Sequence, residues 1–135
     1  MIGIVIVTHG QLGQEILKTA EFIVGSLEGC LTVSIKGDRG PDATRQAIGE
    51  AISAVNKGQG VLVLTDMFGG TPSNISLSFL EEGRVEVLTG VNLPMLIKAI
   101  QLREKGLLAE VAQNIGEYSR KSITVAGEIL GGRAK

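Results

Sequence analysis

The chain has 135 residues, enough for one domain with a sizeable hydrophobic core. Thirteen Lys and Arg residues against fourteen Asp and Glu residues give a net charge of -1, so the basic surface of a protein that binds nucleic acid or an anionic membrane is not expected. Aromatic residues make up only 3%, too few for a surface that stacks single-stranded bases. The single cysteine, Cys30, cannot form an internal disulfide, and no apolar run approaches the ~20 residues of a membrane-spanning helix. These properties predict a cytoplasmic protein.

Short apolar runs alternate with amphipathic helical patterns along the chain. The predicted strands cover residues 2–8, 30–35, 61–65 and 84–89. The predicted helices cover residues 12–24, 41–55, 72–80, 94–105 and 108–119. This alternation predicts an α/β fold with a doubly wound, mostly parallel four-stranded sheet and helices on both faces. A final apolar run at 123–126 follows two helices in succession, which leaves its strand partner and direction open; the whole chain, 1–135, reads as one domain.

Two of the predicted strands lead directly to a reactive side chain. The first ends next to His9, the only histidine, and the third ends next to Asp66. In open α/β sheets, ligands and chemistry gather at the carboxyl ends of the strands. A carboxylate that accepts the N–H of one imidazole nitrogen leaves the other nitrogen free as a nucleophile. His9 and Asp66 are therefore the candidate catalytic pair, with Asp38 and Asp42 as competing carboxylates in a polar turn and at a helix start.

The segment after Asp66 has the composition of an anion site. Gly69 and Gly70 permit a close approach of the backbone, and Thr71 precedes Pro72, a residue suited to the first helical position. Exposed N–H groups at such a turn and the helix dipole favour a phosphate group. The residues predicted to bind phosphate are Gly10, Gly69, Gly70, Thr71 and Ser73.

Several familiar sites are excluded by the sequence. One His and one Cys cannot build a typical zinc site, and no metal is expected. The chain contains no Gly-x-x-x-x-Gly-Lys-Ser/Thr loop, no Gly-x-Gly-x-x-Gly after the first strand and no Gly-x-Ser-x-Gly elbow. Transfer of a phosphoryl group without metal, nucleotide or other cofactor remains.

Four segments in chain order match a known family: residues 4–10, 17–21, 65–74 and 90–96. The most specific is Thr-Asp-Met-Phe-Gly-Gly-Thr-Pro-Ser-Asn at 65–74. With these motifs the chain resembles the enzyme IIA domain of the mannose class of the bacterial phosphoenolpyruvate-dependent sugar phosphotransferase system. The likeness spans most of the chain.

The resemblance implies a phosphotransferase in which His9 receives a phosphoryl group from the phosphohistidine of the carrier HPr and passes it to a histidine of a IIB domain. It implies that Asp66 pairs with the imidazole and that the Thr71 hydroxyl lies beside the phosphate. It also implies a homodimer in which an antiparallel carboxy-terminal strand, here 123–126, is exchanged between subunits. The IIB partner is expected on a separate chain, and contact with the membrane only indirectly through permease components.

Three alternatives remain open at this point. The chain could be a IIA-like donor module for a dihydroxyacetone kinase system, since only the partner would differ. It could be a regulatory protein whose phosphorylation state on His9 changes its binding to a target. A small-ligand module could use His9 and Asp66 to hold an anion without turnover. The sequence does not name the sugar, because no sugar-contacting site is visible.

Overall fold

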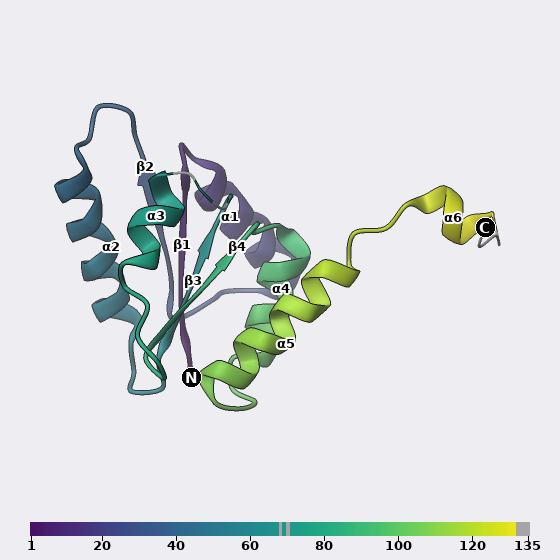
Figure 1. The fold of residues 1–135 in the computed structure, drawn as a ribbon. Helices are drawn as coiled ribbons and strands as arrows, with labels where there is room; N and C mark the ends of the chain where they lie inside the picture. Colours follow the sequence, from purple (N-terminus) through teal and green to yellow (C-terminus); the bar gives the residue numbers. More distant parts are fainter. Residues whose placement is uncertain (68, 70, 132–135) are drawn as a thin grey trace.

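The protein folds around a single all-parallel sheet. The computed structural model describes residues 1–67, 69 and 71–131; for Thr71 and Pro72 it describes the backbone alone. The strands are β1 (Gly3–His9), β2 (Cys30–Ile35), β3 (Val61–Thr65) and β4 (Val85–Thr89). They pair in the order β2-β1-β3-β4, each pair parallel (Figure 1). The predicted four-stranded parallel sheet is confirmed.

Helices cover both faces of this sheet. They are α1 (Leu12–Val24), α2 (Pro41–Val55), α3 (Thr71–Leu77), α4 (Leu93–Leu102), α5 (Leu108–Lys121) and α6 (Ala126–Leu130). Alternate residues of β1 point to opposite faces, so that Ile4 and Ile6 pack under α1, α4 and α5 whereas Val5 and Val7 pack under α2 and α3. All four side chains are fully buried. Continuous β-branched runs are typical of parallel strands buried on both faces.

Some predicted boundaries shift by a few residues. Helix α3 ends at Leu77 rather than at 80, because the following amides bond three residues back, as in a 3₁₀ turn. Helix α4 begins at Leu93, where the Asn92 side chain caps it by accepting the Met95 N–H at 2.9 Å, and ends at Leu102 rather than at 105. Helix α5 continues to Lys121, two residues beyond the prediction. None of these shifts changes the topology.

The apolar run at 123–126 does not form a strand within the described chain, and its predicted exchange across a dimer stays a prediction. Residues 123–125 are irregular, and Ala126 begins the short helix α6. Figure 1 shows this segment leading away from the sheet. A strand requires a neighbouring strand to pair its backbone groups, and this chain places none beside the segment in its described part.

The order of the strands explains where a site can form. From β1 the chain moves outward to β2 and then crosses back to β3 on the other side of β1. The connections that leave the carboxyl ends of β1 and β3 therefore diverge, which opens a crevice at this switch point of the sheet. His9 ends β1, and Asp66 directly follows β3.

Candidate active site

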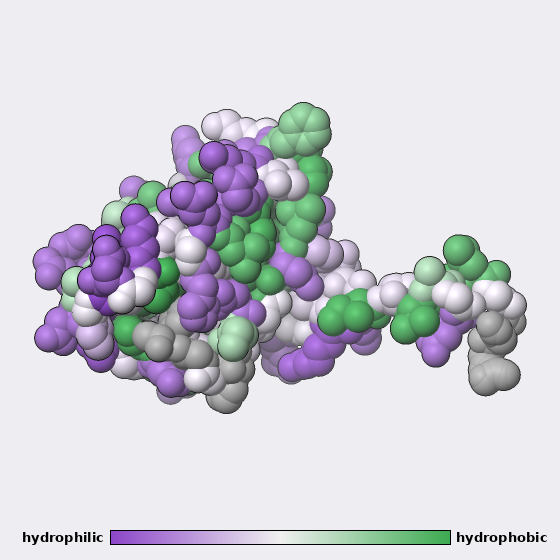
Figure 2. Space-filling model, turned by 90° about the horizontal axis from the view of Figure 1, so that it is seen from above, coloured by the Kyte–Doolittle hydropathy of each residue, from purple (hydrophilic) through white to green (hydrophobic). Residues whose placement is uncertain are grey.

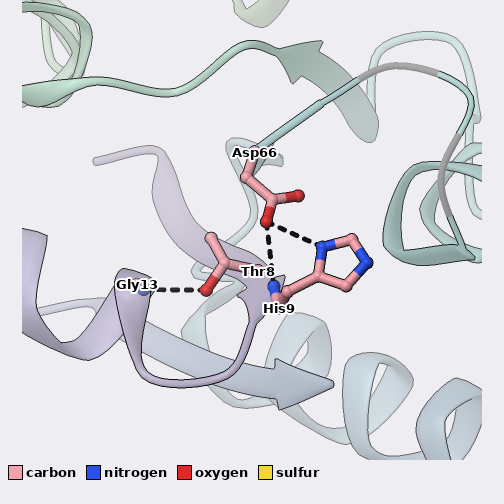
Figure 3. A network of polar contacts seen from close by, with 4 residues as sticks. All are labelled: Thr8, His9, Gly13 and Asp66. Carbon is pink, nitrogen blue, oxygen red and sulfur yellow. Dashed lines mark hydrogen bonds and ion pairs between the residues drawn. The ribbon is translucent and has the colours of Figure 1, made fainter. Parts of the chain in front are cut away.

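Asp66 holds His9 through two contacts with one carboxylate oxygen. Its Oδ2 accepts the backbone N–H of His9 at 2.9 Å and lies 2.9 Å from the ring nitrogen Nδ1 (Figure 3). The side chain of Asp66 is 12% exposed, whereas that of His9 is 52% exposed. A nearly buried carboxylate therefore orients a half-exposed imidazole at the switch point.

The protonation states follow from this geometry. Burial raises the pKa of Asp66, but the hydrogen bonds from the backbone and ring of His9 outweigh it and hold that pKa below its ordinary 3.8. Asp66 is thus ionised at neutral pH and only accepts hydrogen bonds, so Nδ1 of His9 carries the proton. The lone pair is then on Nε2, which lies on the side of the ring away from Asp66 in Figure 3.

The end of β1 is tied to the beginning of α1 by a buried hydrogen bond. The fully buried Thr8 accepts the N–H of Gly13 on Oγ1 at 2.7 Å. A Cβ on Gly13 would lie 3.0 Å from that oxygen, so the absence of a side chain permits the close approach. Gly10 turns the chain between them with a positive φ of 57°. Sequence reasoning missed the hydrogen bond between Thr8 and Gly13. The signal for it in the sequence is a hydroxyl residue and a glycine on either side of the turn.

The competing carboxylates do not contact the imidazole in the described structure. Asp38 lies in the exposed loop after β2, and Asp42 lies in the first turn of α2. Only Asp66 has a hydrogen bond to the ring among these three. The predicted pair of His9 and Asp66 is therefore brought together by the fold.

The residues predicted to bind phosphate do not all lie beside His9 in the described structure. Gly10 adjoins His9, and Gly69 lies in the turn after Asp66 with a positive φ of 89°. Gly70 and the side chain of Thr71 lie outside the described residues, although the backbone of Thr71 begins α3. Ser73 is fully buried and does not reach the surface on which the His9 ring lies, so its contact with phosphate stays a prediction.

Several polar atoms near the switch point are buried without a hydrogen-bond partner among the described residues. They are Thr65 Oγ1, Asp66 Oδ1, Ser73 Oγ and Ser76 Oγ. Buried polar atoms are usually paired, and groups without a partner often mark a functional region. The described residues contain no group of three or more His, Cys, Asp and Glu side chains arranged to hold a metal ion. Within the same residues, no helix has the length and apolar character needed to cross a membrane.

Comparison with known proteins defines the class of this site. The model of the EIIA-man family, described as the PTS system fructose IIA component, matches residues 3–116. The chain therefore belongs to the EIIA-man family of phosphotransferase-system IIA components. Its role is sugar phosphotransfer in the mannose, sorbose and fructose class of IIA components; the resemblance predicted the mannose class.

Individual relatives agree with this assignment. The chain is 30% identical over 131 residues to the fructose-specific EIIA component of Bacillus subtilis (strain 168), a match of 96% of this chain and 90% of that protein. It is 32% identical over 104 residues to the mannose-specific EIIAB component of Escherichia coli (strain K12), covering 76% of this chain but 32% of that protein. The crystal structure of the phosphotransferase system component EIIA from Streptococcus agalactiae superposes with a TM-score of 0.85 at 28% identity, covering 94% and 98% of the two chains.

Proposed function

We propose that His9 carries the phosphoryl group, accepting it on Nε2 from the phosphohistidine of HPr and passing it to a histidine of a IIB domain. The observation that carries this proposal is the contact of Asp66 Oδ2 with Nδ1, which leaves Nε2 unprotonated and exposed. In this proposal residues 1–135 act as one IIA domain in the cytoplasm, and no cofactor takes part.

The chemistry needs few groups. The Nε2 lone pair forms a bond to phosphorus while the N–P bond to the donor histidine breaks, and that electron pair returns to the donor's ring nitrogen. The phosphorylated ring of His9 keeps its Nδ1 proton and gains positive charge, which the ionised Asp66 stabilises. Because one phosphohistidine replaces another, the step is nearly balanced in energy and depends mainly on positioning.

The shape of the surface favours protein partners over a small substrate. Cavities of about 470 and 520 Å³ lie along β4 and α5, lined by residues such as Leu88 and Gly116 rather than by His9. The half-exposed ring of His9 instead lies at the carboxyl end of β1. A phosphohistidine on the surface of another protein can reach such a ring.

The proposal includes a homodimer formed by the carboxy-terminal segment. Its apolar side chains are largely exposed: Ile123 by 76%, Val125 by 62%, Ile129 by 64% and Leu130 by 84%. Figure 2 shows apolar side chains on the projecting segment. Strand β4 is an edge of the sheet, without a further strand beside it in the described chain. Pairing of this segment with β4 of a second copy would cover both, and an exposed edge strand is otherwise prone to unwanted association.

Phosphate transfer from phosphoenolpyruvate through enzyme I and HPr tests the proposal. The wild-type protein is expected to take up acid-labile, base-stable label on Nε2 of His9, and His9→Ala is expected to take up none while keeping its fold by circular dichroism. Full labelling of His9→Ala would place the phosphate elsewhere. Label that no IIB protein of the same organism removes would favour the regulatory alternative. For the dimer, Val125→Lys is expected to give a monomer in analytical ultracentrifugation; an unchanged dimer would exclude the proposed pairing.

A further inference from the structure

Phosphorylation would concentrate negative charge at the switch point. A phosphoryl group on Nε2 adds a charge of about -1.5 to -2 at neutral pH, beside the ionised Asp66. The segments that leave β1, β3 and β4 at this edge, residues 10–11, 66–70 and 90–92, contain no Lys or Arg. Only the connection after β2, residues 36–40, carries cations, Lys36 and Arg39.

This connection begins directly beside His9. Strand β2 is the neighbour of β1, and His9 is paired in register with Ile35. The N–H of Gly10 donates to the Ile35 carbonyl oxygen at 3.0 Å. From the spacing of strands and the rise per residue, the Cα of Lys36 lies about 6 Å from that of His9.

The turn after β2 leads the backbone to the face of the sheet on which His9 lies. Val7 and Ile35 both pack into the core under α2 and α3, and His9 follows Val7 by two residues, so its side chain is on the same face. Arg39 donates its backbone N–H to the Lys36 carbonyl oxygen at 3.1 Å, which closes the turn. The next residue, Gly40, precedes α2 as its N-terminal cap residue, and α2 covers that face.

Neither cation is engaged elsewhere in the described structure. Lys36 and Arg39 are exposed, and the ion pairs among the described residues do not include them. Two anions share this region: Asp38 within the turn and Asp42 in the first turn of α2, where the helix dipole stabilises it. The guanidinium of Arg39 is therefore free to bind an incoming anion.

We propose that Arg39 binds the phosphoryl group carried by His9, with guanidinium N–H groups donating to phosphoryl oxygens. Lys36 adds positive charge at the same edge. The planar fork of an arginine matches two phosphate oxygens at once, which a point charge does not. This inference rests on the proposed phosphorylation of His9.

Chemical phosphorylation of His9 tests the role of Arg39 in the absence of a protein partner. His9 is phosphorylated with phosphoramidate, and the second ionisation of the phosphoryl group is followed by its ³¹P chemical shift against pH. A bound cation holds the pKa of that phosphoryl group down, so Arg39→Gln is expected to raise it by about half a unit. Arg39→Lys is expected to give an intermediate value. The matched control is Lys57→Gln, which removes one exposed cation from the loop before β3, at the opposite edge of the sheet.

Each other outcome overturns the inference in a recognisable way. Identical titrations of wild type and Arg39→Gln, both labelled on His9, would reject the contact and leave the proposed function standing. Slower transfer from phospho-HPr with an unchanged titration would mean that Arg39 contacts the donor protein rather than the phosphoryl group. A wild-type protein that phosphoramidate and phospho-HPr both fail to label on His9 would overturn the proposed function and this inference together.

Discussion

The ends of the parallel strands, here called the amino edge and the carboxyl edge of the sheet, differ at Gly3 and at three glycines of the turns around His9. At the amino edge, a Cβ on Gly3 would overlap the carbonyl oxygen of Val55, so this glycine is required by close packing. At the carboxyl edge, Gly10, Gly69 and Gly90 have positive φ, and no atom of the described residues lies within 4 Å of a Cβ added to them. The protein itself therefore fills the amino edge at Gly3, whereas the turns at Gly10, Gly69 and Gly90 leave space above the carboxyl edge.

The two edges also differ in whether their buried polar groups have hydrogen-bond partners among the described residues. At the amino edge the guanidinium of Arg103, a residue only 4% exposed, donates to the carbonyl oxygens of Ile2, Glu28 and Gly29 at 2.9–3.0 Å. At the carboxyl edge Thr65 and Ser73 are buried with hydroxyls that have no partner among the described residues. Arg103 therefore stabilises the amino edge, whereas the unpaired hydroxyls at the carboxyl edge agree with the binding and transfer proposed there.

The largest expected effect comes from neutralising the carboxylate at the carboxyl edge. Asp66→Asn keeps the size of the side chain but loses the charge that fixes the Nδ1 proton and stabilises the phosphorylated ring. We expect the rate of transfer from phospho-HPr to fall by about 10²–10⁴-fold, the range for loss of such an orienting carboxylate. Rapid-quench labelling measures it. Asp38→Asn, with the same charge change in the loop after β2, is expected to keep its rate; equal losses in both variants would assign the effect to overall charge.

The amino edge is expected to respond in stability rather than in transfer. Arg103→Met would leave the carbonyl oxygens of Ile2, Glu28 and Gly29 without their donors, which predicts a loss of about 3 kcal/mol in the free energy of unfolding. Urea denaturation measures this loss, and labelling of His9 should persist in the folded variant. Arg84→Met is the control, because the exposed Arg84 only contacts Glu81 at 3.5 Å and is expected to change stability by less than about 0.5 kcal/mol. A variant of Arg103 that is as stable as wild type would remove the proposed difference between the edges.

The sequence predicts the features that depend on local pattern and topology. Alternating apolar runs and helical stripes predict all four strands within one or two residues. The meeting of His9 with Asp66 follows because parallel strands end at one edge. The family resemblance then provides the role of this pair and the motif around Thr71, which spacing alone would leave as one turn among many.

The features that sequence reasoning missed depend on packing in three dimensions. Arg103 lies near the end of the helix predicted at 94–105 and looks like an ordinary solvated cation, yet the end of α4 brings it under the start of β1. Ser73 follows Gly70 by three residues, but the short helix α3 turns it toward the core. The segment at 123–126 has the composition of a strand but no pairing partner in its own chain. For Arg103 and Ser73 the outcome depends on neighbours that are distant in sequence.

Acid titration provides a smaller test of the carboxyl edge. The pKa of Asp66 is lowered in the folded protein, so its contribution to stability is present above the unfolded value and is lost as the pH falls through the folded value. Wild type is therefore expected to lose stability below about pH 4, and Asp66→Asn is expected to lose less over the same range. Thermal unfolding from pH 5 to pH 2 measures the difference. Parallel curves for the two proteins would mean that His9 does not hold Asp66 ionised.

The smallest expected effect comes from the unpartnered hydroxyl of Ser73. Its removal is expected to stabilise the protein, whereas Arg103→Met is expected to destabilise it. Ser73→Ala removes a buried polar atom that has no partner among the described residues, so the free energy of unfolding is expected to rise by roughly 1 kcal/mol. Ser78→Ala is the matched control at the other end of α3. Its hydroxyl accepts a hydrogen bond from Arg45 and donates one to the Ile75 carbonyl oxygen, so its removal is expected to destabilise. If Ser73→Ala also slows transfer to His9, then the Ser73 hydroxyl contacts the phosphoryl group during the reaction. The phosphoryl group would then be the hydrogen-bond partner of this hydroxyl. Unchanged transfer with higher stability would remove Ser73 from the residues predicted to bind phosphate.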